Sequence, residues 1–96
     1  MTPLIVDIDD TILTAKFDGK AYYDAEPIDD QIAALHILRQ RGHRIILHTG
    51  RHWDKYEMTV KQLRDLNVMY DQLVMGKPIG IYVDADAVRD LQDLLG

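Results

Sequence analysis

Short apolar runs alternate along this chain with amphipathic stretches of helical spacing, most clearly after residue 27. The alternation constrains the fold more than any other feature, because strands that alternate with helices form a parallel sheet covered by helices. A chain of 96 residues can bury one core and no more. We therefore predict a single α/β domain over residues 1–96, with a parallel sheet between two layers of helices.

Four short apolar runs are the predicted strands. The first, Pro3–Val6 followed by Ile8, is nearly continuous, which is typical of a strand buried on both faces. The second covers Arg44–His48. A third fits within Tyr70–Met75 and a fourth within Ile79–Val83. Each run is short enough to cross a small sheet once.

Three stretches have the spacing of helices. Ile28–Arg41 carries an apolar stripe, and Gly42 ends it. Asp54–Leu66 is the second, with Asn67 suited to a left-handed cap, and a last helix begins at about Ala85. The buried side of the second helix is predicted to hold Tyr56, Val60, Leu63 and Leu66.

Polar side chains follow each predicted strand. Carboxyl ends of parallel strands meet at one edge of a sheet, where α/β proteins bind their ligands. Four segments meet there: Asp7–Thr11, Thr49–Arg51, Gly76–Pro78 and Asp84–Asp86. The sequence therefore predicts one site built from all four segments.

The acidic residues of this site suit a divalent cation. Asp7 and Asp9 are two apart, so on an extended segment both side chains leave the same face. Two such carboxylates repel, and Mg²⁺ prefers hard oxygen ligands from carboxylates and phosphate. Asp84 arrives from another strand and can complete the ligand set, whereas Asp86 suits either a ligand or a first-turn helix residue.

The remaining groups suit a phosphate. Thr49 and the backbone amides around Gly50 can donate to phosphate oxygens, and Lys77 can neutralise charge. Such a set performs phosphoryl transfer, in which Asp7 attacks phosphorus to form an aspartyl-phosphate. Asp9 then serves first as general acid and afterwards as general base.

The order of these motifs resembles the haloacid-dehalogenase-like (HAD) superfamily of phosphotransferases. Leu4–Thr11 is similar to the first motif, hydrophobic residues followed by DxDxT. Ile45–Arg51 is similar to the second, with a TGR ending, and Gly76–Pro78 and Ile81–Asp84 are similar to the third and fourth. The resemblance runs from residue 4 to about 90, and four motifs in order are a specific signal.

The resemblance implies a Rossmann-like sheet in the strand order 4-1-2-3 and a magnesium-dependent phosphatase (EC 3.1.3.-). It assigns Asp7 as nucleophile and metal ligand, and Asp9 as general acid/base with its carbonyl on the metal. Thr49 and Lys77 are assigned to phosphate, and Asp84 to the metal. Where many relatives carry Asp-Asp in the fourth motif, this chain has Asp84 followed by Ala85.

Members of this superfamily differ in the caps that cover the site. The interval from Thr11 to Tyr23 leaves room for a β-hairpin flap, and Arg51 to Lys77 holds one helix and one strand. We therefore predict a member without a cap domain, whose open site suits a phosphorylated small molecule or an exposed macromolecular phosphate. A homo-oligomer, in which a neighbouring subunit covers the site, is an open alternative.

Composition excludes several classes of protein. Sixteen Asp and Glu against eleven Lys and Arg give a net charge of −5, which argues against a nonspecific nucleic-acid binder. There is no cysteine, so disulfides and thiolate metal sites are excluded. No apolar run is long enough to cross a membrane, and the expected location is cytoplasmic.

Simpler interpretations stay open beside the enzyme. The domain can be a catalytically weak module that binds a phosphorylated ligand or partner, which Ala85 favours. Asp7 and Asp9 also suit a turn, Lys77 a solvated loop and Asp84 a helix cap. Trp53, beyond the second motif, can grip a sugar or base or serve packing alone. A receiver domain of two-component signalling is set aside, because no strand ends in an acceptor Asp between residues 11 and 49.

Overall fold

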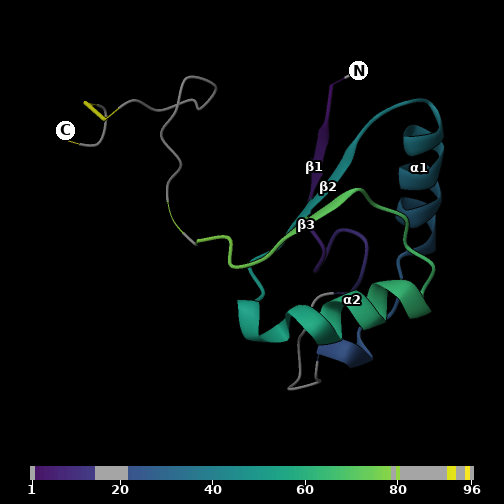
Figure 1. The fold of residues 1–96 in the computed structure, drawn as a ribbon. Helices are drawn as coiled ribbons and strands as arrows, with labels where there is room; N and C mark the ends of the chain where they lie inside the picture. The colour runs from purple at the N-terminus through teal and green to yellow at the C-terminus, as the bar shows by residue number, and fades with distance from the viewer. Residues whose placement is uncertain (1, 15–21, 79, 81–90, 93–94, 96) are drawn as a thin grey trace.

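The computed structural model describes residues 2–14, 22–78, 80, 91–92 and 95. Three strands, β1 (Leu4–Val6), β2 (Ile45–His48) and β3 (Gln72–Val74), form a parallel sheet in the order β1-β2-β3 (Figure 1). This confirms three of the predicted strands and the 1-2-3 part of the predicted order. The predicted fourth strand, apart from Gly80, and the start of the predicted last helix lie outside the described residues.

Helix α1 (Asp29–Gln40) confirms the predicted first helix. Asp29 and Asp30 lie in its first turn, where carboxylates suit the helix dipole. It buries Ile32 and Leu35, which are three residues apart and therefore on one face. Gly42 follows with φ of 103°, a left-handed conformation that glycine adopts without steric cost, and the chain turns into β2.

The predicted second helix is divided in two. A 3₁₀ turn, η2 (Trp53–Lys55), leads into α2 (Tyr56–Asp65), and Asn67 caps its end with φ of 56°, as predicted. The predicted buried face is partly wrong, because Tyr56 is 42% exposed while Thr59 and Gln62 are buried. Neither α1 nor α2 has the length and apolar composition needed to cross a bilayer, and no other described segment does.

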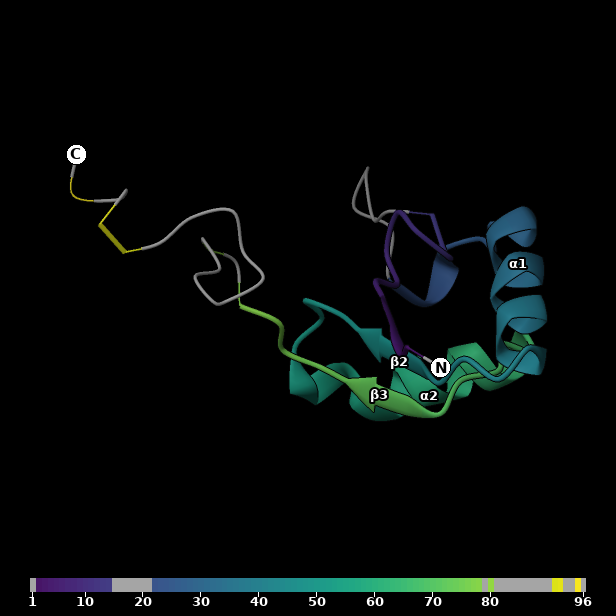
Figure 2. The same ribbon diagram turned by 90° about the horizontal axis from the view of Figure 1, so that it is seen from above.

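One face of the sheet carries the core. Leu4 and Val6 of β1 lie beside Ile45 and Leu47 of β2 in the parallel register. A single cluster joins them to apolar side chains of both helices and of the loops, including Ile8, Ile12, Leu13, Ile32, Leu35, Leu63 and Val68. Figure 2 shows α2 beneath β2 and β3 with α1 beside them. Both described helices therefore contribute to the same layer.

The other face of β1 differs from the prediction. Ile5 points away from the core and is 69% exposed, so burial of this strand on both faces is wrong for the described residues. Parallel crossovers are almost always right-handed, and two successive crossovers in the same direction put both helices on one face of the sheet. The order β1-β2-β3 requires this arrangement for α1 and α2.

The two ends of the segment between β1 and α1 are bonded to each other at its base. Leu13 and Pro27 form an antiparallel bridge, and the Thr14 amide donates to the Glu26 carbonyl at 2.8 Å. The predicted hairpin flap itself falls mostly on residues 15–21, outside the described residues. Near its return, a 3₁₀ turn, η1 (Tyr22–Asp24), lies against α2, where the Tyr23 hydroxyl donates to Asp65 at 2.9 Å.

Candidate active site

The chain turns sharply after β1. The Ile8 carbonyl accepts from the amides of Thr11, Ile12 and Leu13 at 3.0–3.2 Å, and Asp10 has φ of 65°. Ile8 is fully buried at the centre of this turn. Convergence of three amides on one carbonyl therefore bends the backbone between β1 and residue 13, and the prediction that Asp7 and Asp9 share one face stays a prediction.

Asp7 lies at the carboxyl end of β1 and is exposed. Its Oδ1 accepts from the amide of the next residue, Ile8, at 2.8 Å, which fixes the carboxylate beside the backbone. Because Ile8 points into the core, the turn holds Asp7 at the surface while anchoring it from below. The predicted nucleophile is thus accessible and positioned by a buried neighbour.

Asp9 is held by a guanidinium from the neighbouring strand. Arg51, three residues beyond β2, donates from Nε to Oδ2 at 2.9 Å and from Nη2 to Oδ1 at 2.8 Å. This two-point geometry is the strongest form of an Arg–carboxylate pair. It links the first predicted motif to the second across 42 residues of sequence.

Arg51, the last residue of the predicted Thr49–Arg51 segment, lies inside the protein. It is only 1% exposed, and its Nη1 donates to Thr59 Oγ1 at 3.1 Å and to Gln62 Oε1 at 2.7 Å. All three guanidinium nitrogens therefore have acceptors. A signal for this role was present, because Thr59 and Gln62 are polar residues on the helix face that buries Leu63.

The loops after β2 and β3 are hydrogen-bonded to each other. The Lys77 amide donates to the Thr49 carbonyl at 2.9 Å, and the Gly76 amide donates to the Arg51 carbonyl at 2.7 Å. Gly50 lies between these bonds, and a methyl group on it would be 3.7 Å from the Lys77 carbonyl. The structure thus brings the predicted phosphate-binding residues Thr49, Gly50 and Lys77 together.

Thr49 is fully buried and helps to shape this turn. Its Oγ1 accepts from the Arg51 amide at 3.1 Å, so the hydroxyl oxygen has a partner within the loop. Gly50 beside it is exposed, and Lys77 is half-buried. Of the predicted phosphate-binding residues, Gly50 and Lys77 are therefore accessible at least in part, whereas Thr49 is not.

The predicted metal ligands are only partly described. Asp84 and Asp86 lie outside the described residues. Within the part of the chain that the structure describes, no three acidic or histidine side chains gather to hold a metal ion. Asp7 offers an exposed carboxylate at the end of β1, whereas Arg51 engages both oxygens of Asp9. A hard oxygen donor at the end of β1 fits Mg²⁺ chemistry and needs further ligands to complete a site.

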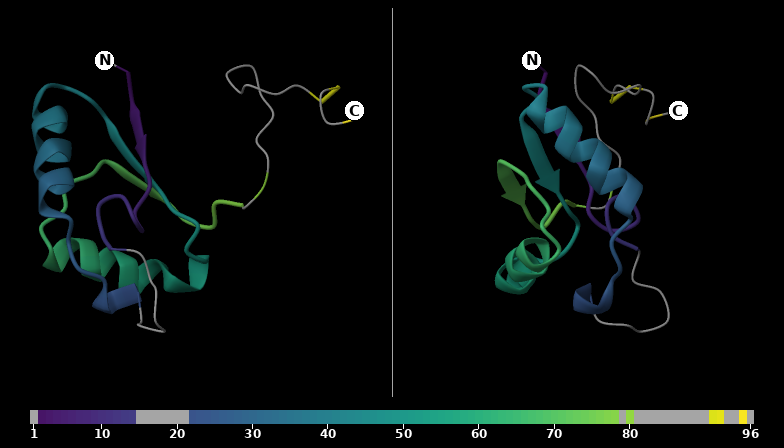
Figure 3. Two further views of the ribbon diagram at one scale, coloured as in Figure 1. Left: turned by 180° about the vertical axis from the view of Figure 1, so that it is seen from behind. Right: turned by 90° about the vertical axis from the view of Figure 1, so that its right-hand side faces the viewer.

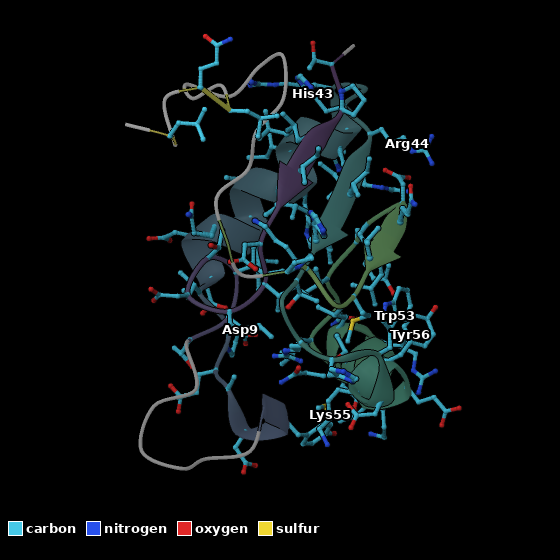
Figure 4. The ribbon with its side chains drawn as sticks, turned by 90° about the vertical axis from the view of Figure 1, so that its left-hand side faces the viewer. Asp9, His43, Arg44, Trp53, Lys55 and Tyr56 are labelled. Atoms are coloured by element: carbon cyan, nitrogen blue, oxygen red, sulfur yellow. The ribbon has the colours of Figure 1, made fainter. Side chains whose placement is uncertain are left out.

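A cavity of about 510 Å³ lies at the opposite end of the strands. Its lining residues are Arg39, Gly42, His43, Arg44 and Asp71. Figure 4 shows His43 and Arg44 at the end of the sheet where the strands begin, whereas Asp9 and Trp53 lie beyond the arrowheads. This cavity is therefore separate from the candidate active site.

Comparison with known protein families and structures agrees with this arrangement. A family model described as haloacid dehalogenase-like hydrolase matches residues 4–75. That range begins with β1 and ends one residue after β3, so it covers all three described strands. No match is found among curated proteins.

Solved structures share the fold. The crystal structure of a target protein from Vibrio cholerae is 29% identical with a TM-score of 0.70, covering 99% of this chain and 94% of that one. A chain of the Pnkp1/Rnl/Hen1 complex is 24% identical with a TM-score of 0.68, covering 86% of this chain. One from the Pnkp1/Rnl/Hen1 RNA repair complex is 23% identical with a TM-score of 0.66, covering 92%. This chain spans only 30% and 27% of those two longer chains.

Proposed function

The chain belongs to the haloacid dehalogenase-like hydrolases, and we propose that it is a phosphatase that hydrolyses a phosphomonoester through an aspartyl-phosphate on Asp7. The observation that carries the proposal is the exposed Asp7 carboxylate at the carboxyl end of β1, at the edge of the sheet where the loops that hold Gly50 and Lys77 are hydrogen-bonded to each other. A carboxylate nucleophile and a second carboxyl two residues away are what acid–base phosphoryl transfer requires.

In the first half-reaction, an oxygen of the Asp7 carboxylate attacks phosphorus in line with the leaving oxygen. The phosphorus–oxygen bond to the leaving group breaks, and Asp9 gives the departing oxygen its proton. In the second, Asp9 takes a proton from water, the water oxygen attacks phosphorus, and the Asp7 carboxylate leaves with the release of inorganic phosphate. Lys77 and the amides around Gly50 balance charge on the phosphate oxygens.

We propose Mg²⁺ as the cofactor, held by the Asp7 carboxylate and the Asp9 carbonyl, with Asp84 completing the set. When bound, the ion supplies charge neutralisation that lets the anionic carboxylate approach an anionic ester. The exposed carboxylate of Asp7 supports this choice. Cytoplasmic location, assembly into a homo-oligomer and the lack of a cap domain stay predictions.

One feature of the geometry favours the alternative of a catalytically weak binding domain. Both oxygens of Asp9 accept from Arg51, which leaves no oxygen of that carboxylate free of a cationic donor. Donation of a proton to a leaving oxygen requires Asp9 to act as a carboxylic acid, whose hydrogen bonds from Arg51 are weaker than those of the carboxylate. If Arg51 keeps Asp9 from acting as the general acid, the protein would bind a phosphorylated ligand without hydrolysing that ligand.

Hydrolysis of a small phosphomonoester, followed as released phosphate with and without Mg²⁺, separates these functions. Asp7→Asn keeps the shape of the side chain and removes the nucleophile, so we expect turnover to fall by at least about 10³-fold. Asp10→Asn is the matched control, because it removes a carboxylate from the same turn and Asn tolerates φ of 65°. Turnover that survives in Asp7→Asn contradicts the assigned nucleophile, and magnesium-dependent binding without turnover in the wild type favours the binding domain.

A further inference from the structure

Trp53 lies on the surface two residues after the buried Arg51. It is 56% exposed, although a tryptophan is among the largest side chains that a core could use. Figure 4 shows it past the ends of the strands, on the α2 side of the site. An exposed indole here is neither core nor required by the turn.

The indole rests on the loop that carries Lys77. A methyl group at Gly76 would be 3.0 Å from both Cδ1 and Nε1 of Trp53, so the ring packs directly on the Gly76 backbone. The Gly76 amide is in turn bonded to the Arg51 carbonyl, and Arg51 grips Asp9. A continuous chain of contacts therefore joins the ring to both catalytic motifs, and Gly76 places it one residue from Lys77.

A second ring stands beside the first. The centroids of Trp53 and Tyr56 are 5.9 Å apart with their planes at 34°, and Tyr56 is 42% exposed. Such a tilted pair fixes the orientation of both rings, because each restricts the other. The result is a preformed aromatic surface next to the proposed phosphate-binding loop.

The charges around this surface nearly cancel. Lys55 and His52 each lie near Asp54, at 3.9 Å and 3.6 Å, and all three are substantially exposed. With neutral His52 the three side chains sum to zero, and the whole chain carries −5. A polynucleotide backbone finds little positive charge to neutralise here, so the surface suits one uncharged flat ring.

We propose that Trp53, braced by Tyr56, is the stacking platform for the base of a nucleotide substrate. The inference rests on the proposed function, because it places the phosphate of that nucleotide at Lys77 and Asp7. Bases stack on aromatic side chains whatever their sequence identity, and the gain corresponds to about 5- to 150-fold in affinity per base. The substrate class is therefore a nucleoside monophosphate, in preference to a simple sugar phosphate.

Trp53 is the only tryptophan of the chain, so its fluorescence reports binding without any need for turnover. The experiment titrates Asp7→Asn protein with adenosine 5′-monophosphate and, separately, with ribose 5-phosphate, both with Mg²⁺. We expect saturable quenching by the nucleotide at a concentration at least about fivefold lower than any effect of the sugar phosphate. Equal midpoints for the two, or tighter binding of the sugar phosphate, overturn the proposal.

Kinetics on otherwise wild-type protein give a second measurement. The ratio of kcat/KM for the nucleotide to that for the sugar phosphate should fall at least fivefold in Trp53→Ala and recover in Trp53→Phe. Ile37→Ala is the matched control, because Ile37 is 48% exposed on α1 and lies outside the site. An unchanged ratio in Trp53→Ala contradicts the platform.

The two measurements keep the proposals distinguishable. Selective quenching of Asp7→Asn by the nucleotide, together with no turnover of either ester by the wild type, supports the stacking platform and contradicts the phosphatase. Turnover of both esters by the wild type, with the same ratio of kcat/KM values in Trp53→Ala, supports the phosphatase and contradicts the stacking platform.

Discussion

The two ends of the sheet each hold an arginine–carboxylate pair, and the pairs differ in nearly everything else. At the carboxyl end, the Arg51 side chain is fully buried, Asp9 is 22% exposed, and the pair has two hydrogen bonds. At the amino end, Arg39 and Asp71 are 37% and 30% exposed and share one bond of 3.0 Å. Only the first pair lies at the carboxyl ends of the strands, the edge at which α/β sheets bind their ligands.

Burial decides what each pair contributes. A guanidinium taken out of water must have all its donors engaged, and Arg51 has acceptors on every nitrogen. Arg39 has a buried Nε that lacks a partner among the described residues, so its guanidinium is less completely hydrogen-bonded than that of Arg51. The comparison teaches that the carboxyl end is built for fixed geometry and the amino end for ordinary surface contact.

Removal of the buried arginine is the most direct test of the difference between the two pairs. Arg51→Ala leaves Asp9, Thr59 and Gln62 without their donor, and we expect the free energy of unfolding to fall by about 3–5 kcal/mol. Urea denaturation followed by circular dichroism measures it. Arg51→Lys keeps the positive charge but lacks the planar guanidinium that donates two parallel hydrogen bonds, so most of the fall in the free energy of unfolding should remain. A midpoint for Arg51→Ala equal to that of Arg39→Ala would show that the two pairs are equivalent.

The next largest effect is expected at Gly76. Its φ of 72° disfavours any side chain, and a methyl group would meet the Trp53 ring at 3.0 Å. Gly76→Ala should therefore lower the free energy of unfolding by about 1–3 kcal/mol. Gly50→Ala is the control, because its methyl group meets only an ordinary contact at 3.7 Å. Equal losses in the two variants contradict the close approach of the indole.

At the amino end of the sheet, acid should reduce the contribution of the Asp71 carboxylate to the free energy of unfolding. The Ile45 amide, which donates to Asp71 Oδ2 at 2.8 Å, and then Arg39 lower the pKa of this carboxyl below its ordinary value of 3.8. A lowered pKa stabilises the fold above the unfolded value, and the stabilisation is lost as pH falls through the folded value. The stability gap between wild type and Asp71→Asn should therefore narrow below about pH 4. A gap that stays constant from pH 6 to pH 2 contradicts the lowered pKa.

The smallest effect is expected at Arg39. Exposed ion pairs contribute little, so the melting temperature of Arg39→Ala should fall by no more than about 4–8 °C. The difference should shrink further in 1 M salt, because salt screens exposed charges. A large fall in melting temperature that does not change with salt would show that Arg39 contributes to stability as the buried Arg51 does.

Much of the fold could be predicted because it depends on local patterns. The stripe of Ile32 and Leu35, the cap at Asn67 and the three strands were all readable from spacing and residue type. Burial was less predictable. Among the described residues, both crossovers place their helices on the face opposite Ile5, and no property of β1 itself carries that information.

The site could be located from sequence but its internal geometry could not. The motifs placed Thr49, Gly50 and Lys77 at one edge, and the structure brings them together. The burial of Arg51 depends on α2 turning two polar side chains inward, which an apolar-stripe analysis assigns to the wrong face. Asp84 and Asp86 stay predictions.

The Arg51–Asp9 contact also bears on how the sheet selects its alignment. Sliding β1 past β2 by one residue would put Ile5 on the core face in place of Leu4 and Val6, and because all three side chains are apolar, hydrophobic matching discriminates only weakly against it. A slide of two residues restores the faces, because Leu4 and Val6 are interchangeable opposite Ile45 and Leu47. It would also carry Asp9 about 6.6 Å along the strand and leave a cation stranded in the interior. The Arg51–Asp9 ion pair therefore selects the strand register of β1 against β2, because it disfavours a shifted register that hydrophobic contacts alone would tolerate.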